Sequence, residues 1–175
     1  MNKDQYFMKI AKVVSTQSKC LSRQIGAVLV RDSHIIATGY NGPPMGVPHC
    51  EWRDWLGNYS NSMKEPIYIC PRERAGFESG EGLQLCPAVH AEMNTILEAA
   101  RFGISTMATT IYCYCGIPCK DCAKELINAG VWRVVHLATP FHPDTDTTGY
   151  NFTLARILFE AVGVQVDAIE LEEDE

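Results

Sequence analysis

The sequence predicts an α/β protein in which helices cover both faces of a sheet. Its 175 residues, 46% of them apolar, suffice to bury one compact core. The second half of the chain alternates helical and strand patterns, which is typical of such folds. The first forty residues add an amphipathic helical pattern followed by two apolar runs.

The N-terminal elements follow from the spacing of apolar residues. Over residues 3–14 apolar side chains recur at helical spacing, which predicts a helix with one buried face. The apolar runs 25–30 and 35–40 predict strands, and the polar segment 31–34 predicts a turn between them. Together these runs are expected to form a hairpin.

After Tyr40 the regular pattern is lost. Residues 43–86 contain glycine, proline and mixed charge without a sustained period, and they predict an irregular insertion within a single domain spanning 1–175. A loop of that length in a small domain needs something to hold it in place. Three of the cysteines lie there: Cys50, Cys70 and Cys86.

The second half of the chain carries three predicted helices and three predicted strands in alternation. Their boundaries are set by glycine and proline, which stop or open regular structure. The helices are expected over 88–102, 118–128 and 152–162, and the strands over 109–114, 131–138 and 164–169.

Charge and composition exclude several classes of protein. The net charge is −6, part of it from the acidic stretch 170–175, and this argues against a broad surface for DNA or RNA. No run of eighteen apolar residues exists, and residues 1–5 lack the apolar segment of a signal peptide. We therefore expect a soluble, cytoplasmic protein. Eight cysteines in a reducing compartment favour metal binding over disulfides.

The strongest motif is His90-Ala91-Glu92 followed by Pro118-Cys119-Lys120-Asp121-Cys122. This His-x-Glu…Pro-Cys-x-x-Cys pattern resembles the signature of zinc deaminases. Cys119 and Cys122 are one helical turn apart, so both thiolates can reach one ion, and a helix N-terminus favours their negative charge. The alternative is a purely structural zinc site.

The spacing suggests a division of labour. One imidazole and two thiolates leave the fourth tetrahedral position of zinc open for water, which is the mark of a catalytic site. Zinc lowers the pKa of that water to ~7. Glu92 is expected to take its proton and to deliver protons to the ring nitrogen and the leaving amine of a cytosine.

Beyond this motif, the chain resembles the deoxycytidylate (dCMP) deaminase family. The resemblance rests on Ser18-Lys19-Cys20, on Thr38-Gly39-Tyr40-Asn41-Gly42 and on the stretch around His90. It implies a three-layer α/β/α sandwich around a mixed sheet of about five strands. It also implies conversion of dCMP to dUMP and ammonia, oligomers that are often hexamers, and regulation by dCTP and dTTP, with Mg²⁺ accompanying a dCTP effector.

The resemblance also implies substrate contacts. Asn41 would contact the sugar, although it is also a suitable turn residue before a glycine. Arg23 and Gln24 would bind the phosphate, Arg23 because its planar fork suits that group; the alternative is a solvated surface charge. Ala91 and Tyr114 are further candidates, Tyr114 as a stacking partner of the base or as an ordinary core tyrosine.

Six cysteines lie outside the catalytic motif. Resemblance and cysteine arithmetic together predict a second, structural zinc that fastens the insertion to the core, bound by Cys20, Cys50, Cys70 and Cys86. The alternative is a set of buried free thiols. Cys113 and Cys115 alternate on a strand and are expected to line the core or the pocket.

Other functions remain open at this point. The Tyr112–Ile117 stretch departs from the family pattern before the first cysteine ligand, so the substrate could be a C5-modified dCMP or dCTP. A base within RNA is disfavoured by the acidic charge. A non-catalytic zinc module is disfavoured by Glu92, because a structural site has no use for that carboxylate.

Overall fold

The computed structural model describes residues 2–52, 68–139 and 149–171. Five strands form one mixed sheet in the order β2-β1-β3-β4-β5. The hairpin β1–β2 and the pair β1–β3 are antiparallel, whereas β3–β4 and β4–β5 are parallel. The strands are β1 (Gly26–Arg31), β2 (His34–Tyr40), β3 (Thr109–Cys113), β4 (Val131–Leu137) and β5 (Gln165–Ile169).

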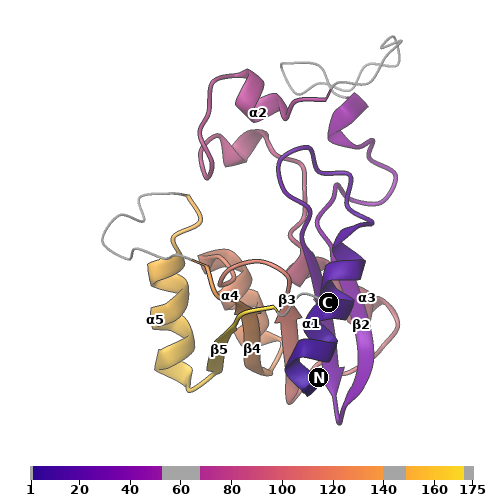
Figure 1. Cartoon of the computed structure of the whole chain (residues 1–175), viewed down its shortest axis with the longest axis vertical. Helices are drawn as coiled ribbons and strands as arrows, with labels where there is room; N and C mark the ends of the chain where they lie inside the picture. The colour runs from indigo at the N-terminus through magenta and orange to yellow at the C-terminus, as the bar shows by residue number, and fades with distance from the viewer. Residues whose placement is uncertain (1, 53–67, 140–148, 172–175) are drawn as a thin grey trace.

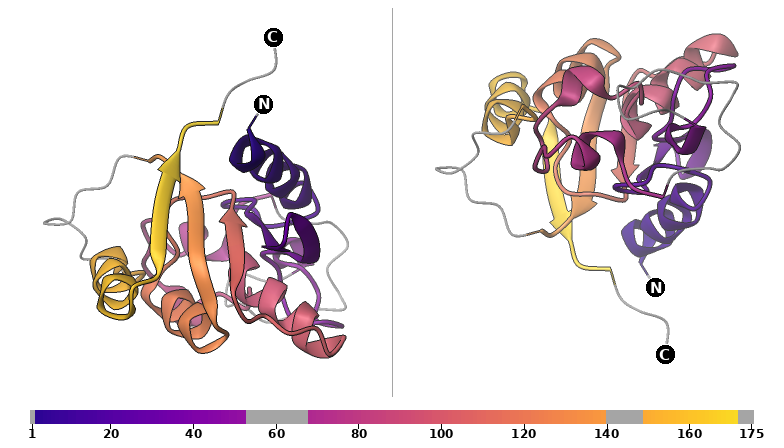
Figure 2. Two further views of the ribbon diagram at one scale, coloured as in Figure 1. Left: turned by 90° about the horizontal axis from the view of Figure 1, so that it is seen from below. Right: turned by 90° about the horizontal axis from the view of Figure 1, so that it is seen from above.

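Helices cover both faces of this sheet, as Figure 2 shows. Helix α1 packs on one face through an apolar cluster that includes Phe7 and Met8. The other three long helices pack on the opposite face, where a larger cluster includes Leu126 and Phe159. The long helices are α1 (Lys3–Ser15), α3 (Ala91–Arg101), α4 (Lys120–Asn128) and α5 (Phe152–Val162). The predicted α/β/α sandwich is therefore confirmed.

The expected element boundaries are reproduced closely, with one informative difference. The helix expected from residue 88 begins at Ala91, because His90 has an extended backbone and acts as the N-cap. The preceding Pro87 disfavours helical geometry in the residue before it. This late start places His90 at the N-terminal end of α3.

The insertion stands beyond one end of the sheet (Figure 1). Its described parts contain two 3₁₀ turns, η1 (Cys50–Trp52) and η2 (Leu83–Leu85), and the four-residue helix α2 (Pro71–Arg74). A two-bond β-bridge joins Gly42 to Val89, so the insertion leaves and re-enters the core at one place. This bridge holds the base of the insertion through backbone hydrogen bonds.

Within the described residues, no helix is long and apolar enough to cross a membrane.

Candidate active site

Three side chains suited to a metal converge where α3 and α4 begin. The Nδ1 atom of His90 lies 3.4 Å from Cys119 Sγ and 3.3 Å from Cys122 Sγ. All three ligand atoms lie within 4.8 Å of one another. Nitrogen and sulfur bound to one tetrahedral zinc stand ~3.5 Å apart, given Zn–N and Zn–S bonds of ~2.0 and ~2.3 Å. The donor set and its spacing therefore fit zinc.

The local backbone geometry leaves these side chains available to bind a metal ion. His90 and Cys119 are the N-caps of their helices, with extended backbones at ψ 154 and 167, and neither side chain caps its own helix. Cys122 follows one turn into α4. The positive ends of the two helices favour the thiolate form of the cysteines.

The three groups share charge even without a metal. Hydrogen bonds from Cys122 and His90 lower the pKa of the Cys119 thiol to about 4. The hydrogen bond to Cys119 raises the pKa of His90 to about 9. Cys119 is thus the ligand most readily present as a thiolate, which is the form that binds a metal ion.

Glu92 lies beside this cluster and is almost fully buried, with 4% of its surface exposed. Burial raises the pKa of its carboxyl, while the charge of His90 opposes that rise. The thiol of Cys115 donates a weak hydrogen bond to Glu92 Oε1 over 3.9 Å. A carboxyl whose pKa is shifted toward neutrality is suited to accept and return a proton.

The cluster forms part of the wall of a cavity of about 770 Å³. His90, Glu92 and Cys119 line it together with three arginines that come from three different parts of the chain: Arg23, Arg72 and Arg156. Glu92 is the one carboxylate among the lining residues. The cavity is therefore rich in positive charge although the chain carries a net charge of −6.

Two of the predicted substrate-binding residues line this cavity. Arg23 is exposed at its rim, where its guanidinium donates a 3.1 Å hydrogen bond to Ser79 Oγ. Asn41 is buried, and its amide bonds the loop that carries Arg23: Oδ1 accepts from the Ile25 N–H and Nδ2 donates to the Arg23 carbonyl, both over 2.8 Å. Asn41 thus shapes the rim, and its sugar contact stays a prediction.

The other three predicted substrate residues do not line the cavity. Gln24 turns back to donate to the Ser18 carbonyl over 2.7 Å, and Ala91 is buried in the core under α3. Tyr114 packs with the cluster on the α1 face of the sheet. This position favours the second of the two expected roles, an ordinary core tyrosine, over a stacking partner of the base. Cys115, the next residue, is the one that lines the cavity.

The four cysteines expected to bind a second zinc are not gathered into a ligand group. Within the described residues, which include all four, the single group of three or more candidate ligands in reach of one another is the His90 cluster. Cys20 and Cys86 line the main cavity. Cys50 is buried in η1 and Cys70 caps α2. The arrangement in this structure thus gives no support to that site.

Several cavity residues escaped the sequence analysis. Arg72 lies in the insertion, where no periodic pattern distinguishes a buried arginine from a solvated one. Tyr150 stacks on Phe152 with ring centroids 5.5 Å apart and lies 6.1 Å from the His90 ring. Arg156 lies on α5, distant in sequence from the zinc motif. Their shared position arises from tertiary contacts alone.

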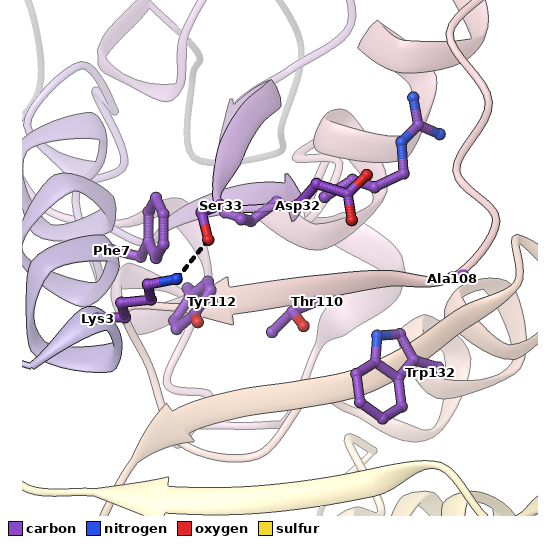
Figure 3. A pocket seen from close by; sticks show the side chains of 10 residues that line it. Lys3, Phe7, Asp32, Ser33, Ala108, Thr110, Tyr112 and Trp132 are labelled. Carbon is purple, nitrogen blue, oxygen red and sulfur yellow. Dashed lines mark hydrogen bonds between the residues drawn. The ribbon is translucent and has the colours of Figure 1, made fainter.

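A second hollow of about 370 Å³ lies on the α1 side of the sheet (Figure 3). Phe7, Tyr112 and Trp132 line it, and Lys3 donates a 2.7 Å hydrogen bond to Ser33 Oγ across its edge. No metal-ligand group of the described residues borders this hollow. The candidate metal ligands and Glu92 therefore belong to the larger cavity.

Comparison with known proteins places the sequence in context. Residues 1–138 match the profile of the cytidine and deoxycytidylate deaminase zinc-binding region. The chain is 35% identical to the deoxycytidylate deaminase of Enterobacteria phage T4 over 147 aligned positions, an alignment that covers 75% of this chain and 76% of that protein.

It is 33% identical over 163 residues to the deoxycytidylate deaminase of Schizosaccharomyces pombe, covering 93% of this chain but 42% of that protein. The chain thus spans less than half the length of this yeast relative. A crystal structure of dCMP deaminase from the cyanophage S-TIM5, in complex with dCMP and dUMP, superposes with a TM-score of 0.64 at 24% identity, covering 94% of this chain and 95% of that one. That similarity indicates a shared fold.

Proposed function

Because this chain belongs to the cytidine and deoxycytidylate deaminase zinc-binding family, we propose that it catalyses the hydrolytic deamination of dCMP to dUMP and ammonia. One observation carries the proposal. A His90–Cys119–Cys122 ligand set and the buried Glu92 stand together in the wall of a cavity lined by three arginines. The relatives named deoxycytidylate deaminase support the same choice of substrate.

The roles of the residues follow from their positions. His90, Cys119 and Cys122 would hold the zinc, which when bound supplies the polarisation that makes water nucleophilic near neutral pH. Glu92 would accept a proton from the attacking water and pass it to N3 of the cytosine. It would then take the remaining proton from the new hydroxyl on C4 and pass it to the amine, which leaves as ammonia while the C4 carbonyl forms. Burial keeps bulk water from the carboxylate and raises its pKa, so it can carry a proton in both directions.

Charge favours a nucleotide over a nucleoside. Three arginines against one carboxylate make the cavity attractive to an anion, although the whole chain is acidic. A nucleoside has no phosphate that could pair with these arginines. The small side chains of Cys115 and Gly116 in the lining also leave a C5-modified dCMP as a second candidate.

Ammonia release from zinc-loaded protein tests the proposal, with dCMP, CMP, deoxycytidine, dCTP and 5-methyl-dCMP as substrates. Turnover of dCMP well above the others is expected. Preference for dCTP or 5-methyl-dCMP would move the substrate assignment while keeping the zinc chemistry. Absence of ammonia from every substrate would reject a cytosine nucleotide deaminase.

The variant Glu92→Gln tests the proton carrier separately. It should retain zinc and lose activity by about 10²–10⁴-fold, because the amide cannot accept a proton. Full activity in this variant would show that Glu92 does not carry the proton.

Finer features of the family stay predictions for this chain. These are dCTP and dTTP effectors with Mg²⁺, a hexamer, a cytoplasmic location, and the second zinc on the four cysteines. Metal counting decides the last. Two zinc ions per chain in the unaltered protein and one in Cys70→Ser would support the second site. One zinc ion per chain in both proteins would reject it.

A further inference from the structure

A buried arginine in the insertion has no carboxylate counter-ion among the described residues. Arg72 is 7% exposed, and its Nη1 donates a 2.6 Å hydrogen bond to the Glu81 carbonyl. Its Nε atom is buried without a hydrogen-bond partner. Within the part of the chain that the structure describes, no carboxylate forms an ion pair with it. Glu81 offers its carbonyl, while its carboxylate accepts from the Glu78 N–H.

A buried cation in this state calls for an anion, because buried charges in proteins are paired or hydrogen-bonded. Arg72 lines the same cavity as the candidate zinc ligands. Apart from burial, the groups that influence its pKa most are Tyr150, Cys70 and Cys86, and none of them is a carboxylate. The missing negative charge can therefore come from a ligand in the cavity.

The fold fixes Arg72 at a set position relative to the zinc ligands. Its backbone carbonyl accepts hydrogen bonds from the N–H groups of Ala75 and Phe77, which close the turn after α2. Tyr150 is close to both Arg72 and His90: its ring centroid is 6.1 Å from the His90 ring, and the nearby Arg72 guanidinium opposes the rise that burial causes in its pKa.

The loop of Tyr150 is itself tied to both sides of the cavity. The Gly149 N–H donates to the Gly80 carbonyl over 3.1 Å, which joins it to the insertion. The Lys120 N–H donates to the Tyr150 carbonyl over 2.9 Å, which joins it to the start of α4 beside the zinc ligand Cys119. The charge in the insertion and the zinc site are thus held at a defined separation.

We propose that Arg72 is the specificity-determining residue that makes this enzyme require a 5′-phosphate, with its guanidinium binding the phosphate while the cytosine lies at the zinc site. The inference rests on the proposed deaminase function. A planar guanidinium suits a phosphate because it donates two parallel hydrogen bonds. Arg23, which is exposed at the rim, contributes less because water screens it.

The test compares dCMP with deoxycytidine in the full-length, zinc-loaded protein. In Arg72→Gln, kcat/KM for dCMP should fall about 10- to 150-fold, the range for loss of hydrogen bonds to a charged group. The value for deoxycytidine should change less than about 2-fold. The control is Arg74→Gln, an exposed arginine on the same short helix, which should leave both values unchanged.

Binding of the products gives a second readout that does not depend on turnover. The ratio of the dUMP and deoxyuridine affinities should fall in Arg72→Gln, and less in Arg72→Lys, which keeps the charge but loses the fork. An equal loss for phosphorylated and unphosphorylated ligands would show a merely structural role and overturn the proposal. Unchanged ratios would also overturn it.

Two further outcomes separate this inference from the proposed function. If Arg72→Gln does not fold, an unchanged affinity ratio in Arg72→Lys rejects the proposal. If the unaltered protein binds dUMP but releases no ammonia from dCMP, the deaminase function fails, and the affinity ratio still decides the role of Arg72.

Discussion

Replacing Asn41 by alanine separates a structural role of this residue from a role in binding the sugar. The change removes two 2.8 Å hydrogen bonds, one to the Ile25 N–H and one to the Arg23 carbonyl. Each bond contributes about 1 kcal/mol, and the partly buried backbone groups left unpaired add a similar amount. We expect the free energy of unfolding to fall by about 2–3 kcal/mol, which lowers Tm by about 4–12 °C.

Urea denaturation at a fixed zinc concentration measures this change. Gln24→Ala is the matched control, because Gln24 lies in the same loop, is exposed, and donates one 2.7 Å hydrogen bond from its amide to the Ser18 carbonyl. It should cost less than about 1 kcal/mol. A loss below about 0.5 kcal/mol in Asn41→Ala, together with a higher KM for dCMP, would refute the structural reasoning and leave sugar binding as the role.

Three more predictions follow from packing, charge and metal binding. Gly39→Ala should destabilise the protein by about 3 kcal/mol, because the new Cβ would lie 2.5 Å from the Thr95 backbone nitrogen and push β2 away from α3. The control is Gly42→Ala, whose Cβ would meet nothing closer than 3.8 Å and which should change the stability by less than about 0.5 kcal/mol in the same denaturation assay. Equal losses of stability in the two variants would contradict the packing argument. The hydrogen-bonded ion pair with Arg133 lowers the pKa of the Asp4 carboxyl below 3.8 in the folded protein. The ion pair therefore stabilises the fold above pH 3.8, and this contribution is lost as the pH falls through the lower pKa of the folded state. The stability difference between the unaltered protein and Asp4→Asn, about 1–2 kcal/mol at pH 7, should shrink toward zero near pH 2, and a difference independent of pH would refute the pairing. Removal of zinc by a chelator should abolish ammonia release and lower Tm, with both restored by added zinc, since a ligand of the folded state alone stabilises that state; unchanged activity in protein shown to be free of metal would rule out a zinc enzyme.

Much of the fold could be read from local patterns. The helix over 152–162 and the strands on either side of the hairpin turn appear within a residue or two of their expected bounds. These signals are local, because apolar periodicity and helix-ending glycines act over a few residues. The sheet order and the pairing of β1 with β3 were not predicted, since they depend on contacts between distant segments.

The candidate site divides in the same way. The zinc triad and Glu92 were predicted because their spacing within two helix N-termini is nearly enough to define the geometry. The sequence allowed Tyr114 to be a base contact or an ordinary core tyrosine, and its packing on the α1 face of the sheet favours the second. The insertion gave no periodic signal. The second zinc site on Cys20, Cys50, Cys70 and Cys86 stays a prediction, because these cysteines are not gathered into one ligand group in the structure.

The sequence by itself determined the chemistry: which atoms can bind zinc, which carboxylate can carry the proton, and which helices present them. The tertiary structure alone decided what surrounds that chemistry. It brought Arg23, Arg72 and Arg156 from three distant segments to one cavity and buried Arg72 with no carboxylate partner among the residues that the structure describes. The reason is physical: ligand spacing within a helix is fixed by 3.6 residues per turn, whereas burial and the pairing of charges depend on every segment packed around a side chain.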